Sequence, residues 1–322
     1  MNKRERVLNA LAGKPVDHVP VGFWYHFQNE EASGLSCVKA HLKYYRQTDL
    51  DFVKIMCDGY FFYPFPEIHS ADEWWNLKPL GKDHPFIREQ VERAKKIVEQ
   101  IGAERCVFYN VFAPFSSIRF TNGDEKIMEH LRANPQAVMH ALDVIAQDNA
   151  DLAEALIREA GCDGIYYCCQ GGEYDRFTEE EYRKWIRPSD LYVLERANRF
   201  SDNNILHLCG FVGRQNRLKM WSEYPAKAVN WAVHVENVSL EEGRLLFGGR
   251  TCLGGFETHF TLDGTYRQGL MYDGTKEQIQ EYTRNLILNF GKRGLILGGD
   301  CTFDARMDNK RLTWIVEAAR SI

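Results

Sequence analysis

The chain has 322 residues, of which 44% are hydrophobic and 26% are charged, and its net charge at pH 7 is −5. This composition provides enough apolar material for a packed core and excludes disorder on a large scale. No dense run of Lys or Arg is present, so the chain lacks the basic stripe that nucleic-acid binding requires.

The N-terminal segment 1–15 begins with charged residues, but its apolar stretch is short and broken, unlike that of a signal peptide. No apolar run approaches the roughly 20 residues that span a bilayer. We therefore expect a cytoplasmic protein without a membrane segment. Its nine cysteines should be mostly free and buried, because disulfides are rare in a reducing compartment.

Eight short apolar runs, rich in β-branched and aromatic residues, predict β-strands along the chain. They lie at 19–25, 52–57, 106–112, 163–169, 204–209, 228–233, 245–255 and 294–301. Helix-like segments separate them, and capping-box spacing marks helix starts at Thr178, Ser239 and Thr275. Eight alternating units predict an α/β fold, a single (β/α)8 TIM barrel that forms one domain over residues 1–322.

Two segments between the strands have their own patterns. Apolar residues at helical spacing predict one or two packing helices over 124–161. The segment 64–86 contains four prolines and the pair Trp74 and Trp75, which indicates a loop insertion. We expect this insertion near the mouth of the barrel, because active sites in this fold are built from loops that follow the strands.

His207 and Cys209 stand two positions apart in the fifth predicted strand, so both side chains should lie on one face of it. Cys301 ends the eighth predicted strand, at the rim where catalytic groups of such barrels converge. Two thiolates and one imidazole favour zinc over a hard ion such as magnesium. They would leave a fourth position for water, substrate or a nearby carboxylate. An H-x-C pair in an apolar strand is also typical of core packing.

Several segments resemble the uroporphyrinogen decarboxylase-like superfamily along almost the full chain. They are KRERVLNALAGKPVDHVPV (3–21), GCDGIYY (161–167), FTEEEYRKWIRPSDLYVLERAN (177–198), HLCG (207–210) and ILGGDC (296–301). Within the superfamily, the chain is most similar to the cobalamin-linked methyltransferase branch. The resemblance implies a TIM barrel, chemistry at its C-terminal face, and zinc held by His207, Cys209 and Cys301. It also implies a corrinoid carried by a partner protein, since this chain has no D-x-H-x-x-G corrinoid-binding pattern.

The chain departs from its relatives at two places. The segment GFWYHFQNE (22–30) has no arginine where the decarboxylases hold substrate propionates, which disfavours uroporphyrinogen as the substrate. The key aspartate of the decarboxylases would fall on Asp58. Around the last cysteine the methyltransferases tend to have Pro-Gly-Cys, whereas this chain has GGDC, which places Asp300 beside the presumed ligand.

The other candidate site residues follow predicted strands. Asp58, Glu257 and His26 are candidates for catalysis, because acidic groups at this rim are costly to desolvate unless they are paired or used, and because histidine titrates near neutral pH. His259 is a further acid–base candidate. The expected substrate-binding residues are Phe23, Tyr25, Gln170, Glu173 and Asp300, although Phe23 and Tyr25 are also typical of core packing.

The sequence therefore predicts a zinc-dependent methyltransferase that moves a methyl group between a small substrate and a corrinoid. The substrate is either a thiol acceptor or an O- or N-methyl donor, and the direction of transfer stays open. Two alternatives remain: a decarboxylase-like enzyme acting on a tetrapyrrole other than uroporphyrinogen, and a non-catalytic ligand-binding barrel. The choice between a monomer and a homodimer also stays open.

Overall fold

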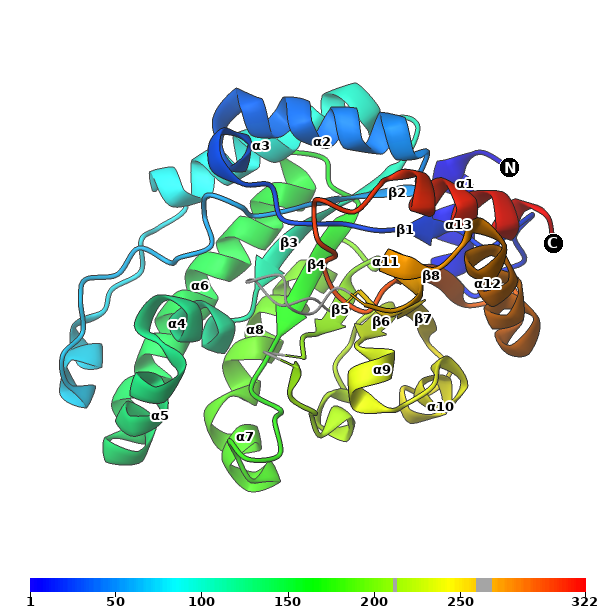
Figure 1. Ribbon diagram of the computed structural model, residues 1–322. Helices are drawn as coiled ribbons and strands as arrows, with labels where there is room; N and C mark the ends of the chain where they lie inside the picture. The colour runs from blue at the N-terminus through cyan, green and yellow to red at the C-terminus, as the bar shows by residue number, and fades with distance from the viewer. Residues whose placement is uncertain (211–212, 259–267) are drawn as a thin grey trace.

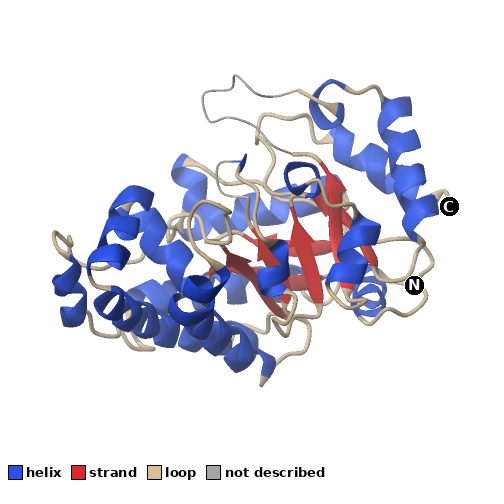
Figure 2. Ribbon diagram, turned by 90° about the horizontal axis from the view of Figure 1, so that it is seen from below, coloured by secondary structure: helices blue, strands red, loops and turns tan. Residues whose placement is uncertain are grey.

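A computed structural model describes residues 1–210, 213–258 and 268–322, and it confirms the parallel eight-stranded barrel. The strands are β1 (Val21–Gly22), β2 (Phe52–Ile55), β3 (Cys106–Phe112), β4 (Gly164–Cys169), β5 (Ile205–Leu208), β6 (Ala228–Trp231), β7 (Thr251–Phe256) and β8 (Leu295–Gly299). Each paired neighbour is parallel, in the order β1-β8-β7-β6-β5-β4-β3-β2. Figures 1 and 2 show the strands at the centre, with helices around them.

The helices of the described residues alternate with the strands and form an outer layer (Figure 1). They are α1 (Lys3–Leu11), η1 (Asn29–Ala32), α2 (Gly34–Thr48), η2 (Ala71–Asn76), α3 (Pro85–Ile101), α4 (Pro114–Asn122), α5 (Asp124–Ala133), α6 (Pro135–Arg158), α7 (Glu179–Trp185), α8 (Arg187–Asn198), η4 (Leu218–Trp221), α9 (Val233–Glu236), α10 (Leu240–Leu246), α11 (Leu270–Asp273), α12 (Lys276–Phe290) and α13 (Lys310–Arg320). No helix in the described ranges is both long and apolar enough to cross a membrane.

The three predicted capping boxes are confirmed. Thr178, Ser239 and Thr275 each accept a hydrogen bond from the backbone three residues later, at the starts of α7, α10 and α12. The segment 124–161 forms two helices, because the Asn134 side chain caps a new helix that starts with Pro135. Local side-chain bonding therefore decides where these helices begin.

Two sequence expectations are wrong in detail. The seventh strand was expected over 245–255, but α10 continues to Leu246, and Gly248 and Gly249 adopt positive φ angles before the strand starts at Thr251. The insertion 64–86 was expected near the barrel mouth, but η2 packs on α6, and the Trp74 indole donates to His130 of α5 over 3.0 Å. This part of the insertion covers the apolar surface of the outer helices.

The barrel closes between β1 and β2, where Asp51 replaces a regular strand ladder. The Asp51 N–H donates to Val21 O, and the Asp51 carboxylate accepts the Val21 N–H, both over 2.8 Å. A Cβ on Gly22 would lie 1.9 Å from the Phe52 ring, so this close approach of the two strands requires glycine.

Helix α1 covers the N-terminal end of the barrel. The Thr251 hydroxyl at the start of β7 donates to Ala10 O of this helix over 2.8 Å. The C-terminal ends of the strands all meet at the opposite face, because every strand pair is parallel. The fold therefore leaves that face for the loops and for the candidate site.

The cysteines are free, as expected. Seven of the nine are buried, and only Cys209 and Cys301 are partly exposed. Cys168 bonds Asn110 inside the barrel, whereas Cys169 lies near Asp190 of α8, so these two neighbours point to opposite faces of β4. The two accessible thiols are those that the sequence assigned to a metal.

Candidate metal centre

The three predicted zinc ligands meet at the C-terminal end of the barrel. His207 lies in β5, Cys209 follows this strand directly, and Cys301 lies two residues beyond β8. One ligand atom from each residue lies within 4.8 Å of the others, and Cys301 Sγ is 3.7 Å from His207 Nε2. In the described parts of the chain, no other group of three His, Cys, Asp or Glu residues converges in this way.

Asn230 on β6 holds the His207 ring. Its amide nitrogen donates to Leu253 O over 2.9 Å and to Gly299 O over 3.2 Å, so its amide oxygen faces His207. This oxygen accepts hydrogen bonds from His207 Nδ1 and from the Tyr166 hydroxyl. With its proton on Nδ1, the imidazole presents the lone pair of Nε2 to the two cysteines, which is the form that binds a metal.

The two thiols of the centre differ in their electrostatics. The neighbouring Cys209 thiol is the main reason that the pKa of Cys301 lies well below its usual value, with further contributions from His207 and Lys54. The same contact and burial raise the pKa of Cys209 well above its usual value. The pair therefore carries one negative charge readily, and a bound cation would favour the second.

The donor set fits zinc, because two thiolate sulfurs and one imidazole nitrogen suit a borderline metal. Neither Asp300 nor Glu257 belongs to the converging group. Asp300 Oδ2 instead accepts hydrogen bonds from the His234 backbone N–H (3.0 Å) and from its Nδ1 (2.8 Å). The three ligands would leave one position of a tetrahedral ion to water or substrate.

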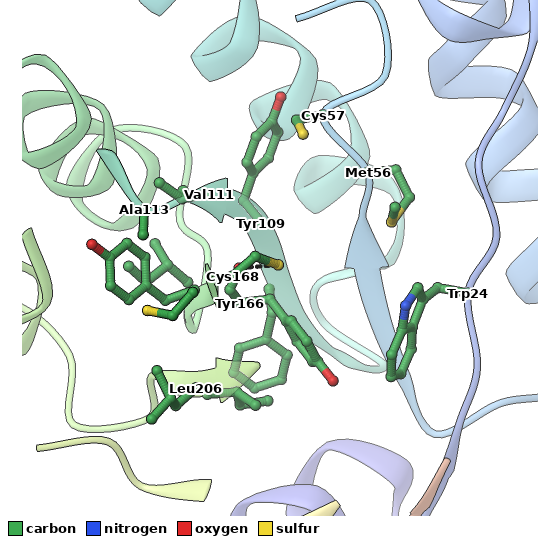
Figure 3. Close-up of a cluster of buried hydrophobic side chains, with 14 of the residues drawn as sticks. Trp24, Met56, Cys57, Tyr109, Val111, Ala113, Tyr166, Cys168 and Leu206 are labelled. Atoms are coloured by element: carbon green, nitrogen blue, oxygen red, sulfur yellow. Dashed lines mark hydrogen bonds between the residues drawn. The ribbon is translucent and has the colours of Figure 1, made fainter. Parts of the chain in front are cut away.

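A cavity of about 70 Å³ adjoins the ligands, and we call it the inner cavity. Its wall is mostly aromatic and apolar, with Trp24, Met56, Phe61, Phe112 and Phe120. Tyr166 and Cys168 project from β4 into the space that Trp24 faces from the other side (Figure 3). Such a lining excludes water from the ligand atoms and strengthens electrostatic interactions there.

A larger space of about 570 Å³, the outer cavity, shares His26 and Phe61 with the inner cavity. Asp58 lines this space, and its Oδ1 accepts a hydrogen bond from His26 Nδ1 over 2.7 Å, while Phe27 N–H donates to its Oδ2 over 2.7 Å. His26 is thus oriented by a carboxylate and stands between the two cavities. This arrangement suits a group that moves a proton at its Nε2 atom.

A model of the family described as uroporphyrinogen decarboxylase (URO-D) matches residues 63–322. The chain belongs to this family. The resemblance found in the sequence is thereby confirmed. No protein of curated function matches the chain significantly.

Solved structures share the fold of this URO-D family member. A methyltransferase from Methanosarcina mazei aligns over 100% of this chain and 98% of its own, with a TM-score of 0.73 and 17% identity. A B12-independent methionine synthase from a Shewanella species aligns over 95% and 94%, with a TM-score of 0.56 and 15% identity. A glycoside hydrolase from Streptomyces cattleya reaches a TM-score of 0.53 at 14% identity, over 93% and 79%. Identities this low show a common barrel fold but do not show which activity this chain has.

The structure separates the other predicted site residues into two groups. His26 and Asp58 line the cavities, and the Gln170 amide, 1% exposed, approaches the Cys209 sulfur. Phe23 packs edge-on against Phe256, and Tyr25 packs among aromatic rings at the edge of the core. These two side chains are therefore not among the residues that line either cavity.

The remaining acidic candidates interact with other parts of the rim. Glu173 Oε1 accepts from buried Arg119 over 2.6 Å, and Asp300 binds His234 as described above. Glu257 follows β7 and contributes to a raised pKa of His234, whose main cause is the hydrogen bond to Asp300. His259 lies outside the described residues.

Sequence reasoning missed two residues of the centre, Lys54 and Asn230. Both interrupt apolar strands, in FVKIMC and AVNWAV, where a polar side chain inside a barrel is costly unless it is used. A polar residue inside an apolar strand run was therefore the sequence signal that could have identified both residues. What each side chain would contact was not readable, because their partners come from other strands.

Proposed function

We propose that this URO-D family member is a zinc-dependent methyltransferase that transfers a methyl group between a small substrate and a corrinoid carried by a partner protein. The observation that carries the proposal is the convergence of His207, Cys209 and Cys301 beside a cavity at the C-terminal face. The full-length likeness to a solved methyltransferase supports the same class of reaction. The substrate is either a thiol acceptor or an O- or N-methyl donor.

When bound, zinc supplies a Lewis acid that lowers the pKa of a thiol or polarises the heteroatom of a methyl donor. Asn230 keeps His207 Nε2 directed toward the two cysteines, so this atom would be in place to hold the ion. Aromatic rings exclude water from the reacting heteroatom. His26, oriented by Asp58, is placed to take up or return the proton that substrate binding or methyl transfer displaces.

The outer cavity is the approach route that we assign to the corrinoid. Its volume of about 570 Å³ exceeds that of the inner cavity, and it meets the inner cavity at His26 and Phe61. A corrinoid held on another protein would thus reach the substrate from the rim, while the substrate heteroatom lies at the metal ligands.

Zinc content tests the metal assignment. We expect about one zinc per chain by elemental analysis, and we expect Cys209→Ala and Cys301→Ala to lose it while circular dichroism shows an intact barrel, since a chain of this size does not need a metal to fold. Cys168→Ala is the matched control, because its thiol lines the same cavity but does not belong to the converging group. Full zinc in both ligand variants would refute the assignment.

X-ray absorption spectroscopy tests the direction of transfer. A thiol substrate should raise the number of sulfur neighbours of the zinc from two to three, with a Zn–S distance of about 2.3 Å. A methyl donor should leave two sulfurs and exchange one oxygen or nitrogen neighbour. Methyl exchange with free methylcobalamin, followed by its absorption spectrum, then tests the corrinoid. A coordination sphere that no candidate substrate alters would make the ion structural and contradict the proposal.

A further inference from the structure

Lys54 is a buried cation inside the barrel. It lies in the middle of β2, is 2% exposed, and lines the inner cavity beside the three metal-ligand candidates. The Tyr45 hydroxyl bonds both its backbone N–H and its backbone carbonyl, which fixes the strand at this residue. Its ammonium lies 3.8 Å from the centre of the Tyr166 ring and 4.4 Å from the centre of the Trp24 ring, so two aromatic faces position the charge.

The Lys54 ammonium has no acidic partner in the described ranges, unlike the buried guanidinium groups of Arg6 and Arg119. Arg6 pairs with Asp51 over 2.7 Å, and Arg119 pairs with Glu173 over 2.6 Å. Around Lys54 the interacting ionisable groups are thiols, foremost Cys168 and Cys301. Burial lowers the pKa of Lys54, because an unpaired ammonium is costly to desolvate. Once both thiolates hold a metal, this ammonium would need an anion from elsewhere.

Counting charges indicates what that anion is, and this step rests on the proposed zinc. Two thiolates neutralise a divalent ion, and His207 binds it as a neutral imidazole. The ammonium of Lys54 then leaves the inner cavity with one uncompensated positive charge. A bound molecule with one negative charge would remove the imbalance.

We propose that Lys54 is the anion-binding group of the inner cavity and that the substrate is a small monoanion held between Lys54 and the His207, Cys209 and Cys301 cluster. The charge is carried either by a carboxylate or by a thiolate. The inner cavity, at about 70 Å³, has room for about two water molecules or for one such group. The rest of the substrate extends past His26 and Phe61 into the outer cavity.

Calorimetric titration with propionate and its neutral counterpart propionamide tests the carboxylate. We expect wild-type protein to bind propionate about tenfold or more tightly than propionamide, because the ion gains a charge-assisted hydrogen bond. Lys54→Met should lose this preference, while Lys39→Met, which removes an exposed ammonium of α2, should keep it. The titrations are made on zinc-loaded and on metal-stripped protein, so a preference that persists without zinc supports Lys54 even if the metal proposal fails.

A second arm uses 1-propanethiol with the zinc-loaded protein and distinguishes the two sources of charge. Binding that weakens about tenfold in Lys54→Met, with no preference for propionate in the wild type, would assign the charge to a thiolate. Equal binding of propionate and propionamide by the wild type, together with thiol binding that Lys54→Met leaves unchanged, would overturn the proposal. The comparison of propionate with propionamide needs no variant. If Lys54→Met does not fold, a wild-type preference for propionate still supports the proposal, and the absence of both this preference and 1-propanethiol binding would overturn it.

Discussion

Asn230 is the residue on which the geometry of the metal centre depends. Two backbone carbonyls fix its amide nitrogen, and its oxygen then selects the tautomer of His207. Partners of this kind orient a ligand without touching the ion. The strand register places Asn230 directly beside His207 on the neighbouring strand.

We expect Asn230→Ala to weaken zinc binding by about 10- to 100-fold, because the His207 ring loses its orientation. Competition with a chelator of known affinity measures this change. Tyr166→Phe is the matched control: it removes a second donor to the same oxygen but leaves the amide held by two carbonyls. A loss in Tyr166→Phe as large as that in Asn230→Ala would contradict the orienting role of the amide.

His41 gives the molecule a measurable pH dependence of stability. This residue of α2 is fully buried, donates from Nδ1 to Cys37 O over 2.8 Å, and accepts the Met56 N–H on Nε2 over 3.0 Å. Burial lowers its pKa from 6.5 to about 4. The unfolded chain therefore takes up a proton at a higher pH than the folded chain does, and stability present above the unfolded pKa is lost as the pH falls toward about 4.

We expect wild-type protein to lose about 2 kcal/mol relative to His41→Gln between about pH 7.5 and about pH 5, since the variant lacks this titration. Urea unfolding of both proteins at several pH values measures the difference. Other titrating groups cancel in the comparison. A difference that stays constant over this range would show that His41 is not held neutral in the folded state.

At the scale of elements, the seam between β1 and β2 depends on one carboxylate. Asp51 is fully buried, bonds the backbone of Val21 twice, and pairs with Arg6 of α1 over 2.7 Å. It thus joins the barrel seam to the helix that covers the N-terminal end. Arg6 also pairs with Asp17, whose side chain is 38% exposed.

Replacing Asp51 by Ala should destabilise the protein by about 3 kcal/mol, because it leaves a buried Arg6 donor and the Val21 N–H unpaired. Asp17→Ala removes the exposed partner of the same arginine and should cost less than about 1 kcal/mol. Chemical unfolding measures both values. Equal effects of the two variants would show that burial of the pair does not decide its contribution.

At the scale of the whole molecule, the barrel brings Lys54 from β2, His207 from β5 and Cys301 from beyond β8 to one cavity. This site is small and has one buried cation among its described lining residues. Among the described residues that line the outer cavity, the one arginine or lysine is Arg306. Its guanidinium already pairs with the Asp304 carboxylate over 2.8 Å. Neither space presents the paired cations that a substrate with many carboxylates needs.

We therefore expect no decarboxylation of uroporphyrinogen, although the chain belongs to the URO-D family. Chromatographic analysis for coproporphyrinogen, with an authentic uroporphyrinogen decarboxylase as the positive control, measures this. Formation of coproporphyrinogen at an enzymatic rate would show that propionates are held by residues other than those of segment 22–30.

Much of the fold was readable from the sequence, because local patterns determine it. Strand runs alternate with helices that begin at Thr178, Ser239 and Thr275, and each of these caps bonds backbone only three residues away. The error at the seventh strand has the same origin, since LLF (245–247) is apolar enough for either structure and the helix begun at Ser239 runs into it. The His207 and Cys209 pair was readable for the same reason, because their spacing is local.

The sequence by itself determined the barrel and the three residues that converge, through strand periodicity and family resemblance. Only the tertiary structure decided that Asn230 orients His207, that Lys54 faces the same cavity, and that Arg119 and His234 engage Glu173 and Asp300. These contacts join residues from 23 to more than 50 positions apart. Local propensity does not specify such contacts, because they depend on which strands become neighbours and on which side chains share the interior of the barrel.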